Sequence, residues 1–145
     1  MQSGGYRVYY VTSGGPNSIA SAFSSDGLTI TAEGTRIPAA DGVMYVDPAV
    51  VYVDGYGYLM ALGRVPNTAI GNAVLMLAYS SDGLNWTLDN KVLKSNTSYY
   101  LADPTMVVSG GTIRIYYQGW QWGTVAAGRH AGRDVDGRAQ SMTGA

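Results

Sequence analysis

The chain has 145 residues, enough for one domain, and its 9 Lys and Arg against 10 Asp and Glu residues give a net charge of -1, so no basic surface favours a nucleic-acid partner. It has no cysteine and one histidine, His130, which excludes thiolate and histidine-rich metal sites, and we expect neither a metal nor another cofactor. No run approaches the roughly 20 apolar residues of a membrane helix, and no apolar signal-peptide core opens the sequence, which leaves the compartment open.

Many tyrosines, valines and glycines predict β-strands joined by tight turns, with plain alternation at 6–11 and 112–117. In chain order these strands are expected over residues 6–11, 47–53, 58–65, 73–80, 86–93 and 112–117. Asp-Gly pairs at 54–55 and 82–83 stand between neighbouring strands and suit tight hairpin turns. Because sustained helical spacing is missing from the first 118 residues, the fold class is predicted to be all-β.

An internal repeat organises these strands. The run Ser-Ser-Asp-Gly-Leu occupies 24–28 and again 80–84, which are 56 residues apart. The pair Asp-Pro occurs at 47–48 and at 103–104, also 56 residues apart. The strand with Arg-Val-Tyr-Tyr at 7–10 has a counterpart with Arg-Ile-Tyr-Tyr at 114–117. Two independent markers with one spacing indicate a repeated structural unit.

The repeated unit has the make-up of a β-propeller blade. Four antiparallel strands fall within one 56-residue period, over 47–93. Residues 1–119 are therefore predicted to form a partial propeller: strands two to four of one blade, one full blade, and strands one and two of a third. Propellers typically close with about 4–8 blades. We expect either a longer gene product or a homo-oligomer that covers the open edges.

The last part of the chain has a different composition. Residues 123–145 are rich in Gly, Ala, Arg and Asp and show no alternation. The segment 120–145 is therefore predicted to be disordered or irregular.

The motifs of the repeat resemble those of the five-bladed propeller glycosidases, the arabinanase and xylosidase type with its levansucrase relatives. The similarity lies in Val-Asp-Pro-Ala-Val-Val-Tyr-Val-Asp-Gly at 46–55, in Ala-Tyr-Ser-Ser-Asp-Gly-Leu-Asn-Trp at 78–86, and in Ala-Asp-Pro-Thr-Met-Val-Val at 102–108. It covers about residues 6–118. The resemblance implies blades around a central cavity and a carbohydrate ligand.

Two aspartates are the residues to which the resemblance assigns chemistry. In such enzymes an Asp at the start of an innermost strand acts as general base, and another tunes the pKa of the general acid. By motif, Asp47 and Asp103 hold these positions in successive blades. Glycoside cleavage requires one protonated and one ionised carboxyl group at the bond. A purely structural role is the alternative, because Asp before Pro can bond to nearby backbone amides at a turn.

The general acid of such enzymes has no clear counterpart. Glu33 is the only glutamate in the chain, and the 56-residue spacing aligns it with Asp89. That position lies after an Asp-Gly turn, in the outermost strand, so Glu33 is not expected to be catalytic.

Four further side chains are candidates for contact with a sugar. Trp120 and Trp122 would share one face of a strand and could stack on a pyranose ring. They could equally pack on a missing part of the blade. Arg64 and Arg114 could donate hydrogen bonds to hydroxyl groups, or lie between blades or in solvent.

The sequence supports two functions of different class. One is a glycoside-hydrolase-like propeller that acts on or binds poly- or oligosaccharide and is catalytically incomplete alone. The other is a non-catalytic carbohydrate-binding or assembly module. A product without any function is a third possibility.

Overall fold

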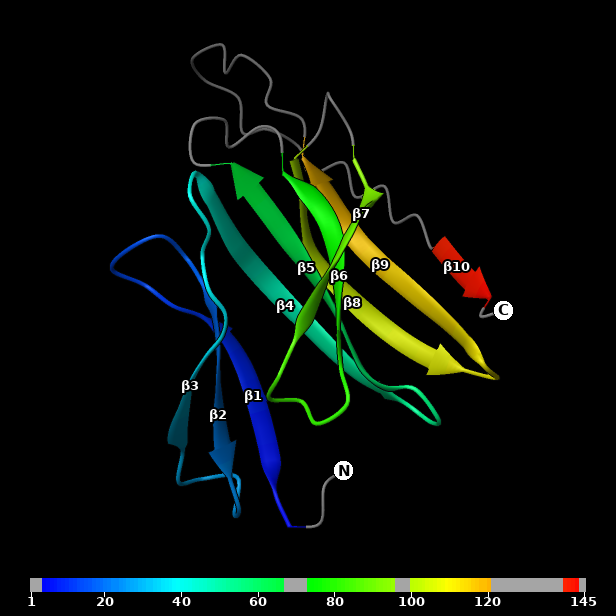
Figure 1. Cartoon of the computed structure of the whole chain (residues 1–145). Helices are drawn as coiled ribbons and strands as arrows, with labels where there is room; N and C mark the ends of the chain where they lie inside the picture. The colour runs from blue at the N-terminus through cyan, green and yellow to red at the C-terminus, as the bar shows by residue number, and fades with distance from the viewer. Residues whose placement is uncertain (1–3, 67–72, 96–99, 121–139, 144–145) are drawn as a thin grey trace, which may run out of the picture.

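The computed structural model describes residues 4–66, 73–95, 100–120 and 140–143. Within these ranges the chain forms ten β-strands in three antiparallel sheets and no helix, so the all-β prediction is confirmed (Figure 1). It follows that these ranges contain no helix with the length and hydropathy needed to cross a membrane.

The sheets follow the order of the chain. The first sheet contains β1 (Tyr6–Val11), β2 (Ile19–Ser24) and β3 (Thr31–Ile37). The central sheet contains β4 (Val43–Val53), β5 (Gly57–Pro66), β6 (Val74–Ser80) and β7 (Thr87–Lys94). The third sheet has the order β10-β9-β8, with β8 (Tyr100–Ser109), β9 (Thr112–Trp120) and β10 (Gln140–Thr143).

The central sheet is the four-stranded unit that the sequence predicts over 47–93. Its strands pair antiparallel in chain order, as a meander. The main difference is at the first strand, which begins at Val43 rather than at Asp47. Proline is tolerated at the start of a strand, which favoured a boundary at the Asp-Pro step, whereas Pro48 lies inside β4 at a shift of the pairing register. Asp47 is therefore a mid-strand residue.

The third sheet extends beyond its predicted boundary. The prediction gave irregular structure from residue 120 onward, and residues 121–139 lie outside the described residues. Gln140–Thr143 nevertheless form β10, which pairs with the first half of β9 through Gln140 opposite Ile115 and Thr143 opposite Thr112. This strand has four residues, too few for alternation to reveal it in the sequence.

Two hydrophobic cores lie on opposite faces of the central sheet. On one face Met60 and Leu62 pack with Ile19 and Ile37 of the first sheet. On the other face Leu59 and Ala61 pack with Met106 and Ile115 of the third sheet. Because successive side chains of a strand point to opposite faces, β5 supplies both cores in turn. The three sheets therefore pack face to face in sequence order, with β8 against β4, β5 and β6.

Candidate functional site

The two candidate aspartates occupy equivalent positions in neighbouring strands. Asp47 lies in β4 and Asp103 in β8, and each of these strands is the first strand of its sheet. In both strands the pairing register shifts at the Asp-Pro step, between Val46 and Ala49 and between Ala102 and Thr105. Such irregularities bend a strand and re-aim a side chain. The repeat thus places the same local distortion at each aspartate.

Both aspartates have an unfavourable backbone conformation. Their φ angles are +53° at Asp47 and +49° at Asp103, and they are the only described residues other than glycine with positive φ. The left-handed region is disfavoured for residues with a Cβ, although Asp tolerates it better than most. A following proline disfavours helical conformations further. The strain is on the order of 1–3 kcal/mol at each residue and is typical of functional sites.

The two residues are in direct contact. Oδ2 of Asp47 accepts a hydrogen bond from the backbone N–H of Asp103 at 3.4 Å. Asp47 is half-buried while Asp103 is exposed. Burial raises the pKa of Asp47, the bond from the Asp103 amide acts against this, and the nearby Asp103 charge raises the pKa again. The hydrogen bond brings the two motif positions, which are 56 residues apart in the sequence, into one place in the structure.

A tyrosine that the sequence analysis did not single out belongs to the same site. Tyr100, the first residue of β8, is partly buried. Burial raises the pKa of its hydroxyl, and the charges of Asp47 and Asp103 raise it further. A neutral phenol close to two carboxyl groups is a hydrogen-bond donor and acceptor of the kind that sugar hydroxyls require.

An open cavity of about 450 Å³ adjoins Pro48, the residue that follows Asp47. It lies between the start of β1 and the second half of β4, and its wall is rich in aromatic side chains. Among its lining residues are Tyr6, Tyr9, Tyr52, Tyr58 and Phe23. The rings of Tyr52 and Tyr58 meet edge to face, with centroids 5.1 Å apart. The abundance of tyrosine in the sequence was a signal for this wall, but its place could not be read from composition.

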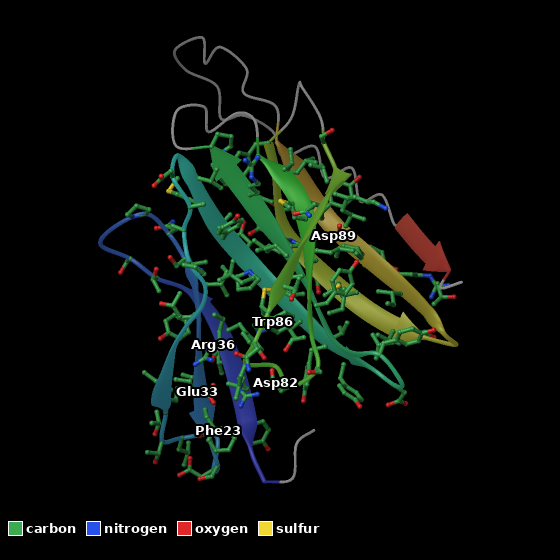
Figure 2. The ribbon with its side chains drawn as sticks, in the orientation of Figure 1. Phe23, Glu33, Arg36, Asp82, Trp86 and Asp89 are labelled. Atoms are coloured by element: carbon green, nitrogen blue, oxygen red, sulfur yellow. The ribbon has the colours of Figure 1, made fainter. Side chains whose placement is uncertain are left out.

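Glu33 lies where the sequence places it, in the outermost strand of the first sheet (Figure 2). Arg7 donates two hydrogen bonds to its carboxylate, from Nε at 2.8 Å and from Nη2 at 3.0 Å. The buried Ser21 hydroxyl donates a third at 2.8 Å. The bonds from Arg7 hold the pKa of Glu33 below its ordinary value. A carboxylate so held has a structural role and is a poor proton donor.

The two arginine candidates do not contact the aspartates. Arg64 lies in β5 between Tyr45 of β4 and Val74 of β6, and Arg114 lies exposed in β9. In the part of the chain that the structure describes, neither arginine forms a hydrogen bond or ion pair with Asp47 or Asp103. Trp120 ends β9, opposite Tyr100. Trp122 lies outside the described residues.

No group of three or more acidic or histidine side chains that could hold a metal ion occurs in the described ranges. No family model matches the sequence, and the search of curated proteins also finds no match.

Proposed function

We propose that this chain is a glycoside-hydrolase-like array of propeller blades that binds carbohydrate at Asp47, Asp103 and Tyr100. The observation that carries the proposal is the pair of strained aspartates, repeated in two adjacent strands and joined by a hydrogen bond. The strain recurs at equivalent positions of two sheets, at the register shift of each strand. A site that presents polar groups to a ligand accounts for it.

The neighbouring cavity supports a neutral sugar as the ligand. Sugar rings have apolar faces that pack on aromatic side chains and hydroxyl groups that bond to carboxylates. The cavity beside Pro48 supplies the aromatic wall, with Tyr52 and Tyr58. The aspartates do not line this cavity, and Pro48 connects it to Asp47 along the chain. The near-zero net charge of the chain agrees with an uncharged ligand.

Hydrolysis requires a proton donor that the described residues do not place at this site. Glu33 is held by Arg7 and lies in the outermost strand of the first sheet. The proposal therefore assigns ligand binding to this chain, with Asp47 as the base or pKa-tuning carboxylate if a further chain or segment supplies an acid. A purely non-catalytic binding module is the second candidate. It is favoured because the ion pair with Arg7 keeps Glu33, the only glutamate, from acting as a general acid.

Binding and turnover separate these functions. We expect arabinan and xylan oligosaccharides to give saturable heats in titration calorimetry, and Asp47→Asn and Asp103→Asn to weaken binding at least about tenfold, as for loss of a charged hydrogen-bond partner. Asp54→Asn, in the exposed β4–β5 turn, is the matched control. Release of nitrophenol from nitrophenyl glycosides would identify a complete hydrolase. Absence of binding to every oligosaccharide would overturn the carbohydrate proposal.

A further inference from the structure

The joint between the first and central sheets is built around one tight turn. The turn at 82–83, where Figure 2 labels Asp82, connects β6 to β7. Two side chains of β1 donate hydrogen bonds to it. The Tyr9 hydroxyl donates to the carbonyl oxygen of Gly83 at 2.7 Å, and Nη1 of Arg7 donates to that of Asp82 at 3.3 Å. Both acceptors are backbone atoms, so the contact depends on the turn itself.

Apolar contacts complete this joint. The ring of Trp86 meets that of Tyr9 edge to face, with centroids 5.5 Å apart. Gly83 is buried, and a Cβ at this position would come within 2.8 Å of the Tyr9 hydroxyl and 2.9 Å of Nη1 of Arg7. A larger residue would therefore displace the two side chains that hold the turn, and it would also be strained by the φ of +73° at this position.

The strand pairings give Arg7 and Tyr9 exact counterparts in the third sheet. In the first sheet Tyr6 pairs with Ser24, and in the central sheet Tyr58 pairs with Ser80. Ser24 and Ser80 are equivalent positions of the repeat, so Tyr6 corresponds to Tyr58 and Arg7 to Leu59. In the central sheet Leu59 pairs with Val51, and in the third sheet Arg114 pairs with Val107. Val107 lies 56 residues after Val51, so Leu59 corresponds to Arg114. By the same steps Tyr9 corresponds to Ala61 and then to Tyr116. The third sheet thus carries an Arg–Tyr pair at the positions that hold the turn in the first.

The first sheet carries the counterpart of the turn. Asp26 accepts hydrogen bonds from the amides of Leu28 and Thr29, as Asp82 does from those of Leu84 and Asn85. Gly27 and Gly83 have φ angles of +77° and +73°. The 24–28 turn therefore has the geometry of the turn that Arg7 and Tyr9 hold.

The side chains beside the 24–28 turn are uncovered. Leu28 is 87% exposed and Ile30 is 65% exposed, whereas their counterparts Leu84 and Trp86 are partly buried at the joint. On the same face of the first sheet Val8 and Tyr10 are also exposed, although their counterparts Met60 and Leu62 are fully buried. Apolar residues that are buried in one unit and exposed in its repeat mark a surface that lacks its partner.

The two uncovered surfaces lie at opposite ends of the stack. Arg7 of the first sheet contacts the central sheet, and its counterpart Leu59 in the central sheet packs against the third sheet. The face that carries these residues is therefore directed toward the next sheet in the chain. Arg114 and Tyr116 therefore face away from the central sheet, and both are exposed. The 24–28 turn belongs to the first sheet, at the other end (Figure 1).

We propose that copies of this chain associate head to tail, with Arg114 and Tyr116 of one copy holding the 24–28 turn of the next. Tyr116 would donate to the carbonyl oxygen of Gly27 and Arg114 to that of Asp26. Ile30 would pack on the Tyr116 ring in the place of Trp86. The contact joins two different surfaces, so it leads to a closed ring or to a filament. Two copies supply six sheets, within the range of about 4–8 blades of known propellers.

A second copy is the occupant because this chain carries both halves of the joint. Self-pairing of either surface would bring turn to turn or Arg114 to Arg114, and neither reproduces the contacts of the internal joint. The net charge of -1 imposes little repulsion between copies.

The test uses one charge at each surface. We expect the full chain to have a mass by light scattering of at least twice the 15.3 kDa of one copy. Ile30→Glu or Tyr116→Glu should weaken this association at least about 30-fold, the effect of losing a binding hot spot. Tyr56→Glu, in the exposed β4–β5 turn of the central sheet, should leave the mass unchanged. Circular dichroism checks folding, and Leu28→Glu and Arg114→Glu are the substitutes for a variant that fails this check.

Mixing the variants gives the sharpest result. Ile30→Glu retains an intact Tyr116 surface, and Tyr116→Glu retains an intact 24–28 turn. Each variant alone should be a monomer, while their mixture should form a complex of one copy of each and stop there. A wild-type chain that stays monomeric at every accessible concentration overturns the proposal. So does association that either variant leaves intact, or a mixture that stays monomeric.

Discussion

The hydroxyl of Tyr9 lies 2.7 Å from the carbonyl oxygen of Gly83, although the two residues are 74 positions apart in the chain. This bond connects β1, an edge strand of the first sheet, to the β6–β7 turn of the central sheet. The carbonyl oxygen of Gly83 also accepts a hydrogen bond from Nε1 of Trp86 at 3.1 Å. The contact between the two sheets thus combines hydrogen bonds to the 82–83 turn with the packing of the Tyr9 ring on Trp86.

Removing this hydroxyl should weaken the joint by a measurable amount. Tyr9→Phe keeps the ring that packs on Trp86 and deletes only the donor to Gly83. We expect the free energy of unfolding to fall by about 1 kcal/mol, the usual worth of a partly buried hydrogen bond. Urea denaturation followed by Trp fluorescence measures the change. Tyr10→Phe, on the opposite and exposed face of β1, is the control, and an equal loss in both variants would contradict the assignment.

A pair of glycine substitutions isolates the steric part of the same joint. Gly27→Ala and Gly83→Ala both place a Cβ at a positive φ, at a cost on the order of 1–2 kcal/mol. Only at Gly83 does that Cβ meet Tyr9 and Arg7 at less than 3 Å. In a monomeric background such as Tyr116→Glu, Gly83→Ala should therefore cost roughly 1–3 kcal/mol more than Gly27→Ala, the usual penalty for overpacking. Equal denaturation midpoints would show that the sheets do not meet as described.

The ion pair of Arg7 and Glu33 predicts a loss of stability in acid. Because the pKa of Glu33 is lowered in the folded chain, its contribution is present above the ordinary glutamate pKa of about 4.3 and is lost as the pH falls through the lowered value. Glu33→Gln should cost roughly 1.5–3 kcal/mol at pH 7, the worth of hydrogen bonds to a charged group. The difference between wild type and variant should shrink below about pH 4. Denaturation curves across this range test it, and a constant difference would contradict the ion pair.

The sequence was sufficient to predict the central sheet because local signals define it. Strands β5 and β6 are continuous apolar runs that are buried on both faces, and the Asp-Gly pair at 82–83, between β6 and β7, has the positive φ at Gly83 that its chemistry allows. The repeat also placed Glu33 and Asp89 in outermost strands, where the structure has them. These features depend on neighbours along the chain.

The features that the sequence did not reveal depend on contacts between sheets. The bond from the Asp103 amide to Asp47 exists because β4 and β8 lie side by side, and no spacing rule encodes it. The bidentate ion pair joins Arg7 of β1 to Glu33 of β3 across an intervening strand. Strand β10 could not be predicted because its four residues gain their order from β9. Tertiary packing, not propensity, decides each of these.

The paired aspartates predict the opposite pH dependence from Glu33. Because burial raises the pKa of Asp47, the folded chain binds its proton more tightly than the unfolded chain does. As the pH rises above the ordinary aspartate pKa of about 3.9 and through the raised pKa of Asp47, the folded state loses stability, because the half-buried carboxyl group becomes charged. Asp47→Asn avoids this charge, retains a side-chain acceptor for the Asp103 amide, and tolerates the left-handed conformation.

We therefore expect Asp47→Asn to be more stable than wild type at pH 7 and equal to it near pH 3. Asp103→Asn should also stabilise the fold at neutral pH, because it removes the neighbouring charge that raises the pKa of Asp47. Asp54→Asn supplies the background effect of deleting one negative charge from the surface. Chemical denaturation at several pH values measures all three. If Asp47→Asn is the less stable protein at pH 7, the carboxylate is a structural cap for the Asp103 amide, and its strain serves the fold rather than a ligand.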